Sequence, residues 1–245
     1  MKEEPLKGGM SARQVVKIEN RVHRSKSSNH VFVHQVLRHL EQFDFSYAPR
    51  FLDVDNKERE ILTFIEGEVP RAFELDFEQI KQAVEVLRKL HDVLAKSALK
   101  GKKQTICHND FAPWNIIIKN NQVVGIIDFD ECAPGNRMDD LAYFIWTFLD
   151  LGTSNDADGL QIDKIDKLIH AYGSGIQKAD LVPAILEQQY RILKFRQQII
   201  KEEKDAALVD FSKSAVQRIQ KSMVWLRFNR KKIEETILKI KNGNE

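Results

Sequence analysis

Two short segments of the chain carry oxygen-bearing side chains that could act together. Residues 108–115 read HNDFAPWN, and residues 126–130 read IIDFD. Between them an apolar run, the turn sequence KNNQ and a second apolar run predict a β-hairpin. A hairpin returns Asp128 beside Asn115, and Asp110 lies in the loop that enters the first strand. We therefore expect Asp110, Asn115 and Asp128 to converge at one end of the hairpin.

This set of side chains suits phosphoryl transfer. Mg²⁺ prefers oxygen ligands, keeps several waters and is usually held by one or two protein groups together with phosphates. Asn115 and Asp128 can supply those groups, and Asp110 then remains to orient and deprotonate an acceptor hydroxyl. Asp130 is a candidate for a second metal or for the acceptor. The alternative is that Asp110 and Asn115 only cap turns, the usual role of Asp and Asn.

The spacing of the two segments favours the catalytic interpretation. His108, Asp110 and Asn115 follow the kinase catalytic-loop pattern H-x-D-x-x-x-x-N, and Asp128 with Phe129 supplies the D-F-x element on the next strand. An isolated HxD is common, whereas the full pattern joined to a hairpin of this length is specific. Because Asp110 already serves as proton acceptor, we expect His108 to be a hydrogen-bonded orienting residue.

Through these motifs the chain resembles the aminoglycoside phosphotransferase and choline kinase-like family of small-molecule kinases. HNDFAPWN is similar to the family's catalytic loop, H-G-D-x-x-x-x-N, and IIDFD is similar to its metal-binding element. Residues 15–24, 48–55 and 61–70 resemble a bacterial branch that includes trifolitoxin immunity-like proteins. The resemblance covers nearly the whole chain. It implies a bilobal, protein-kinase-like α+β fold with a small β-rich N-lobe and a larger helical C-lobe.

The resemblance also implies a site for ATP or GTP with Mg²⁺. The residues implied to contact the nucleotide are Gly8, Gly9, Met10, Ser11, Arg24, Thr63 and Ile65. The glycine pair is similar to a turn that lets the backbone approach phosphate, although an ordinary turn has the same sequence. Arg24 matches the position of a phosphate-contacting Lys, and its alternative is a solvated charge at a strand end. The backbone C=O of Thr63 and N–H of Ile65 are the expected contacts to the adenine edge, in a connector that is otherwise a plain linker.

Two further positions matter for catalysis. The family places a Glu on the helix after the basic residue, but residues 31–37 read VFVHQVL and contain none. His34 or Gln35 could take its place, or the pairing is absent, which puts phosphate positioning in doubt. Asp140, preferred here to Asp139, resembles the family's helix-start Asp that braces the catalytic loop; as an N-cap it would also stabilise its helix.

The rest of the chain supplies the elements that position these residues. Residues 1–66 read as a nucleotide-binding lobe of short strands around one helix at 31–43, and residues 67–245 as a helical lobe that holds the hairpin. Apolar stripes predict a long helix at 77–97, with His91 on its buried face. The remaining predicted helices are 139–151, 160–172, 179–202 and 206–241.

Composition limits the location and the partners. The chain has 245 residues and a formal net charge of +2, so nothing demands nucleic acid or an anionic membrane as partner. Its first residues, MKEEPLKGGM, lack the apolar core of a signal peptide, and no apolar run reaches the roughly 20 residues of a membrane span. Cys107 and Cys132 cannot build a disulfide framework and are expected to be inert thiols. A cytoplasmic protein is expected; the oligomeric state stays open.

The acceptor is expected to be a small molecule with a hydroxyl that meets Asp110. From residue 153 onward there are 17 Lys and Arg against 13 Asp and Glu, a balance of +4, which disfavours a polycationic aminoglycoside. A sugar, an amino alcohol or another neutral or zwitterionic metabolite fits no worse. The predicted function is ATP-dependent phosphorylation of such a molecule. The alternative is a non-catalytic, kinase-like binding or immunity protein that sequesters a toxin or antibiotic.

Overall fold

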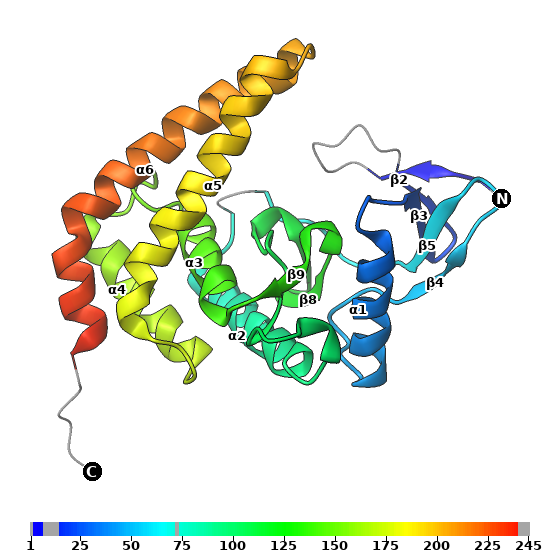
Figure 1. Ribbon diagram of the computed structural model, residues 1–245, viewed down its shortest axis with the longest axis horizontal. Helices are drawn as coiled ribbons and strands as arrows, with labels where there is room; N and C mark the ends of the chain where they lie inside the picture. Colours follow the sequence, from blue (N-terminus) through cyan, green and yellow to red (C-terminus); the bar gives the residue numbers. More distant parts are fainter. Residues whose placement is uncertain (1, 7–14, 72–73, 240–245) are drawn as a thin grey trace. The chain divides into compact units, whose positions relative to one another are not determined.

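The structure, a computed structural model, describes residues 2–6, 15–71 and 74–239 (Figure 1). The chain divides into two compact units, Met1–Arg137 and Met138–Glu245. The first unit holds the strands and two long helices, and the second is helical. This is the α+β composition expected from the sequence. The predicted division at residues 66 and 67 concerns lobes rather than these units and stays a prediction.

The first unit opens with a five-stranded antiparallel sheet in the order β1-β2-β3-β5-β4. Its strands are β1 (Glu4–Pro5), β2 (Val15–Ile18), β3 (Arg21–Ser25), β4 (Phe51–Val54) and β5 (Arg59–Thr63). A tight turn joins β2 to β3, with Glu19 in the left-handed region at φ 56°, so the hairpin expected there is present. The register pairs Arg24 on β3 directly with Glu60 on β5. This cross-strand pair brings two opposite charges together.

Two amphipathic helices belong to the same unit. The helix α1 (His30–Gln42) buries Val33, Val36, Leu37 and Leu40, the apolar stripe seen in the sequence. The helix α2 (Phe77–Leu94) begins with a capping box: the Asp76 carboxylate accepts the Gln79 N–H, and the Gln79 side chain accepts the Asp76 N–H. His91 is fully buried on α2, as expected for a core histidine.

The predicted hairpin is formed by β7 (Ile116–Lys119) and β8 (Gln122–Ile126), with Asn120 and Asn121 both at positive φ in the turn. A second ribbon was not predicted. It pairs β6 (Thr105–Cys107) with β9 (Ala133–Gly135) and thereby ties the start of the catalytic segment to the end of the IIDFD segment. Three-residue strands are too short to show the alternation on which strand prediction depends, and Pro134 argues against a strand.

The second unit consists of helices. They are α3 (Arg137–Phe148), whose first residue belongs to the first unit, α4 (Asp158–Tyr172), α5 (Leu181–Glu202) and α6 (Ala206–Leu238). The helices α5 and α6 pack along each other, and the buried Gln189 donates to Ser222 across them at 2.9 Å. All four were predicted to within about three residues at each described end. Among the described residues, none of the helices combines the length and apolar character needed to cross a bilayer.

Candidate active site

Hydrogen bonds join Asp110 and Asn115, the two candidate functional residues of the segment 108–115. The Asn115 amide Nδ2 donates to the Asp110 carboxylate Oδ2 at 2.8 Å and to the Asp110 backbone O at 2.9 Å. The Asn115 backbone O accepts the N–H of Ile127 at 2.9 Å. The hairpin therefore brings Asn115 beside the residue that precedes Asp128. The convergence expected from the sequence is present in the backbone.

His108 lies behind this loop, almost fully buried. Its Nδ1 accepts the Asp110 backbone N–H at 3.3 Å, and its Nε2 lies 3.1 Å from the Ile127 carbonyl oxygen. Because Nδ1 accepts and a carbonyl can only accept, these two contacts fit the tautomer that carries its hydrogen on Nε2. His108 thus ties Asp110 to the strand that leads into Asp128. This geometry agrees with the expected orienting role.

Two turns near the site use a left-handed backbone. Asn109 has φ 64° and Asp128 has φ 65°, a conformation that Asn and Asp adopt more readily than other side chains. The Asn109 side chain donates to the Glu131 carbonyl at 2.9 Å, which joins the two turns. The Asp128 side chain is 46% exposed, so its carboxylate faces solvent at the end of the hairpin.

Arg24 reaches from the sheet to the acidic segment. Its Nη1 lies 3.2 Å from Asp128 Oδ1, its Nη2 lies 2.6 Å from Asp130 Oδ1, and its Nε donates to Glu60 Oε1 at 2.5 Å. Burial alone would lower the pKa of Arg24, but the carboxylates of Asp130, Glu60 and Asp128 outweigh it and raise that pKa above its ordinary value. Arg24 is therefore not the solvated strand-end charge considered above.

Glu60 is the site residue that the sequence did not reveal. Its side chain is 1% exposed, and its second oxygen, Oε2, lies 2.7 Å from His34 Nε2 on α1. The acid beside Arg24 is thus Glu60, which lies on the strand β5 and not on the helix. His34, one of the two helix residues proposed to take the place of the missing Glu, contacts Glu60. Gln35 is exposed. The only sequence signal was an acidic residue in a strand, REILT, that is otherwise apolar in its interior.

The connector residues implied to bind adenine are Thr63, the last residue of β5, and Ile65, two residues further along the chain. The Phe64 N–H donates to Asn20 O at 3.2 Å, whereas the Ile65 N–H makes no hydrogen bond within the described part of the chain. The Ile65 side chain packs on the hairpin: a Cβ at Gly125 would lie 2.8 Å from two of its carbons. Lys17 covers the Phe64 ring, with its Nζ 3.9 Å from the ring centre. Among the described residues, the Ile65 N–H is thus a backbone donor that a ligand could use.

Three other groups of predicted residues have different outcomes. Gly8, Gly9, Met10 and Ser11 lie outside the described residues. Asp140 is buried in the first turn of α3, in the second compact unit, and its bracing role stays a prediction. Cys107 and Cys132 are both buried free thiols, and the Cys107 Sγ donates to the Asn136 carbonyl at 3.2 Å.

The donor set fits Mg²⁺. The amide nitrogen of Asn115 donates to Asp110. The amide oxygen Oδ1 has no hydrogen bond within the described residues, so it is the Asn115 atom that can bind a cation. Three carboxylates, Glu60, Asp128 and Asp130, face the single guanidinium of Arg24, so this cluster has a formal net charge of −2. Amide and carboxylate oxygens with excess negative charge are what a hard divalent cation prefers.

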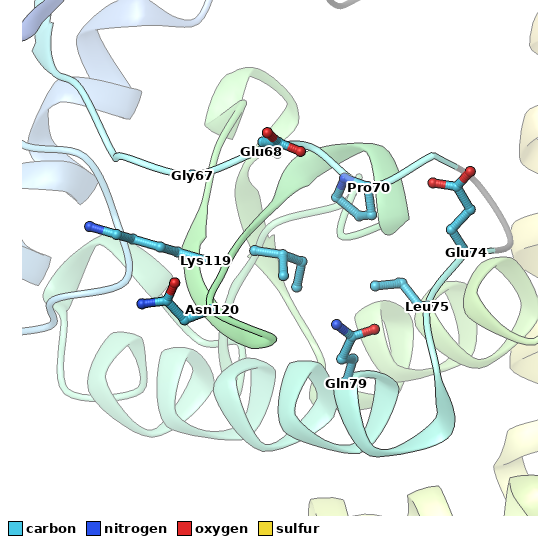
Figure 2. A pocket seen from close by; sticks show the side chains of 9 residues that line it. Gly67, Glu68, Pro70, Glu74, Leu75, Gln79, Lys119 and Asn120 are labelled. Atoms are coloured by element: carbon cyan, nitrogen blue, oxygen red, sulfur yellow. The ribbon is translucent and has the colours of Figure 1, made fainter.

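A separate pocket of about 410 Å³ opens beside the connector (Figure 2). It lies between residues 67–70 and 74–75, the tip of the hairpin and the first turn of α2. Its walls are mixed: Glu68 and Glu74 are acidic, and Lys119 is already paired with Glu66 at 2.6 Å. Asp110, Asn115 and Asp128 do not line it, so this pocket is not part of the candidate active site.

Comparison with known proteins supports the same chemistry. Residues 92–179 match the model of the APH family, described as "Phosphotransferase enzyme family". That segment contains Asp110, Asn115, Asp128 and Asp130. A curated relative, the trifolitoxin immunity protein of Rhizobium leguminosarum bv. trifolii, is 29% identical over 151 residues. This match covers 55% of the chain and 58% of that protein, which is less than two thirds of the relative's length.

Two solved structures are similar over almost their whole length. A spectinomycin phosphotransferase in complex with ADP and spectinomycin has a TM-score of 0.64 at 15% identity, with 94% of this chain and 93% of that chain covered. A choline/ethanolamine kinase family protein from Mesorhizobium loti has a TM-score of 0.60 at 13% identity, with 93% of each chain covered. These likenesses confirm the protein-kinase-like α+β fold and the resemblance to aminoglycoside phosphotransferases and choline kinases.

Proposed function

We propose that this chain is a kinase that transfers the γ-phosphoryl group of ATP to a hydroxyl of a small molecule. The observation that carries the proposal is the bond from the Asn115 amide to the Asp110 carboxylate, at the end of a hairpin that also carries Asp128. If Asp110 and Asn115 only capped turns, the Asp128 carboxylate at the end of the next strand would have no role beside them. The match of residues 92–179 to a phosphotransferase family supports the same reaction class.

Asp110 is the residue proposed to act on the acceptor. Its Oδ2 is fixed by Asn115 and its backbone N–H by His108, so the carboxylate is oriented before the acceptor arrives. The acceptor hydroxyl donates its proton to Asp110 while its oxygen forms the bond to the γ-phosphorus. The bond from the γ-phosphorus to the bridging oxygen then breaks, and ADP leaves with that electron pair.

The remaining residues bind the nucleotide. Asn115 Oδ1 and the Asp128 carboxylate would hold Mg²⁺, with Asp130 beside these two ligands. The bound Mg²⁺ would neutralise charge on the β- and γ-phosphates. Arg24 can donate its two terminal nitrogens to phosphate oxygens in a bidentate way. The backbone of Thr63 and Ile65 would contact the adenine edge, and residues 8–11 would cover the phosphates.

For the acceptor we propose a neutral or zwitterionic molecule, such as a sugar or an amino alcohol, rather than a polycation. The excess of basic residues after residue 152 supports this choice, since a polycation requires an acidic surface. The similar structures belong to proteins of both kinds, a spectinomycin phosphotransferase and a choline/ethanolamine kinase family protein, so they do not select between acceptors.

The test is turnover of Mg-ATP and Mg-GTP over a panel of aminoglycosides, choline, ethanolamine, sugars and amino alcohols. The variant Asp110→Asn keeps the shape of the side chain but cannot accept a proton. We expect it to reduce kcat by about 10²–10⁴-fold while ADP binding, measured by calorimetry, stays unchanged. Asp163→Asn, an exposed change on α4, serves as the control and should leave kcat unaltered. Equal kcat in wild type and Asp110→Asn would show that Asp110 is not the proton acceptor.

The second candidate is a kinase-like binding protein that confers immunity by sequestering a toxin. The similarity to a trifolitoxin immunity protein favours it, as does an Arg at the position expected for Lys. Nucleotide binding without turnover on any acceptor of the panel would support this candidate over the kinase. Tight binding of trifolitoxin that is unaffected by Asp110→Asn would do the same.

A further inference from the structure

The basic residue of the site is held by an acid from the sheet. Arg24 and Glu60 are directly opposite each other on β3 and β5, and the Arg24 Nε–Glu60 Oε1 distance is 2.5 Å. Because β3 and β5 are neighbours in one sheet, their backbone hydrogen bonds fix the distance between these two side chains. Both members of this pair therefore lie on the sheet and neither on a helix.

The second oxygen of Glu60 has its own partner. His34 Nε2 lies 2.7 Å from Glu60 Oε2, and the imidazole is stacked on the Phe51 ring with centroids 3.6 Å apart. Glu60 is nearly fully buried, so both of its oxygens need hydrogen bonds from protein groups. Arg24 satisfies one oxygen and His34 the other. The carboxylate is therefore held in a single orientation by two different elements.

The three nitrogens of the Arg24 guanidinium have different carboxylate partners. Glu60 takes the Nε edge, and the two terminal nitrogens are left to point at Asp128 and Asp130. Without the charge of Glu60, the attraction of Arg24 would be concentrated on those two carboxylates. They are also the groups proposed to face Mg²⁺, so Arg24 and the cation would then compete for them.

We propose that Glu60 is the positioning residue for Arg24, that it replaces the missing helix glutamate, and that His34 fixes it through its N–H. This inference rests on the proposed nucleotide site, and it states which residues set the affinity of that site for Mg²⁺-nucleotide. Neither Glu60 nor His34 touches the reacting atoms. Arg24 contacts both Asp128 and Asp130, and the effect of Glu60 and His34 is to weaken its hold on these carboxylates so that Mg²⁺ can displace it.

The test measures binding rather than turnover. The affinity of each variant for a fluorescent ADP analogue is determined as a function of Mg²⁺ concentration, and circular dichroism checks the fold. Glu60→Gln keeps the shape and the hydrogen bond to Arg24 but removes the charge. We expect it to raise the Mg²⁺ concentration for half-maximal binding about tenfold. Glu58→Gln is the matched control: its side chain is 82% exposed and pairs with Lys26, so its Mg²⁺ requirement should equal that of the wild type.

Variants of His34 separate positioning from a general loss of charge. His34→Leu removes the N–H donor and leaves every carboxylate unchanged, and it should raise the Mg²⁺ requirement about threefold. His34→Gln restores a donor, and its Mg²⁺ requirement should lie within about twofold of the wild type. If Glu60→Gln does not fold, this pair alone decides. Equal Mg²⁺ requirements in wild type, Glu60→Gln and His34→Leu would overturn the proposal, as would a His34→Gln variant that behaves like His34→Leu.

The result is distinct from the test of the reaction. If the wild type binds the ADP analogue with Mg²⁺ but phosphorylates no acceptor, the kinase reaction is wrong and the comparison among variants still decides the role of Glu60. If the variants match the wild type in binding while the wild type is an active kinase, only the role of Glu60 is wrong. If the wild type binds no Mg²⁺-ADP at all, both proposals are wrong.

Discussion

Asp55 determines the geometry of the turn that leads into β5. Its Oδ2 accepts from His23 Nδ1 at 3.0 Å and from Arg59 Nε at 2.8 Å, and its Oδ1 accepts the backbone N–H groups of Lys57 and Arg59 at 2.9 Å. Burial would raise the pKa of Asp55, but the hydrogen bonds from His23 and from Arg59 outweigh it and hold that pKa well below its usual range. The charged form of Asp55 is thus part of the fold.

The lowered pKa of Asp55 leads to a prediction about how stability depends on pH. A carboxyl whose pKa is lower in the folded chain stabilises it fully above the unfolded pKa, about 4, and the contribution is lost as the pH falls toward the folded value. We expect Asp55→Asn to reduce the free energy of unfolding by about 2 kcal/mol at pH 7, and we expect the difference from the wild type to shrink below about pH 4. Urea unfolding at pH 7, 5 and 3.5 measures it. A difference that stays constant down to pH 3.5 would contradict the role of the Asp55 charge.

At this scale the sequence predicts some residues and not others. Asp110 and Asn115 are five positions apart in one loop, so local spacing suffices to place them together. Glu60 is 36 positions from Arg24, and their contact depends on the register between β3 and β5. A one-residue shift of that register would turn Glu60 to the other face of the sheet. Nothing local in the sequence specifies the register, so the sequence alone does not predict Glu60 as the partner of Arg24.

At the scale of elements, the connector after β5 is joined to the hairpin by backbone hydrogen bonds. The Glu68 N–H donates to Ile118 O at 2.9 Å, and the Ile118 N–H donates to Glu68 O at 2.8 Å. Gly67 makes this approach possible, since its φ is +143° and a Cβ there would lie 2.6 Å from both Ile117 Cγ2 and Ile118 O. The helices could be predicted from their periodicity, but this contact, like the β6–β9 ribbon, joins short segments that have no periodicity.

Gly67→Ala should therefore break the contact between connector and hairpin. We expect a loss of about 2–4 kcal/mol in the free energy of unfolding, because the new methyl group meets backbone atoms and the φ is unfavourable for any L side chain. Gly101→Ala is the control: its φ is also positive, at 58°, but a Cβ there meets nothing within 4 Å, so only about 1 kcal/mol should be lost. Thermal and urea unfolding compare the two. Equal losses would mean that the contact with the hairpin contributes nothing.

At the scale of the whole molecule, the described residues of the proposed nucleotide site share one compact unit. Arg24, Thr63, Ile65, Asn115 and Asp128 all lie within Met1–Arg137. The sequence placed Arg24, Thr63 and Ile65 in a lobe that ends at residue 66 and Asn115 and Asp128 in the next. The first compact unit of the structure contains both sets. These compact units are not the predicted lobes, so the lobe boundary at residues 66 and 67 stays a prediction.

Nucleotide should accordingly protect this unit. We expect Mg²⁺-ADP to slow amide hydrogen exchange in residues 59–68 and 115–128, because a ligand at 100 times its Kd stabilises the bound form by about 2.7 kcal/mol. ADP with EDTA should give much weaker protection, since the fit of Asn115 and Asp128 to Mg²⁺ is part of the proposal. Exchange followed by mass spectrometry measures it. Protection confined to residues 138–245 would place the nucleotide elsewhere.

The position of Glu60 on a strand has a consequence for control. In protein kinases an ion pair between a strand lysine and a helix glutamate must be in place for activity, and moving the helix switches the enzyme. Here the acid that holds Arg24 belongs to the same sheet, so moving α1 would remove the His34 contact but not the strand that carries Glu60. The output of the proposed kinase would then follow mainly the supply of acceptor and nucleotide and the number of copies of the protein.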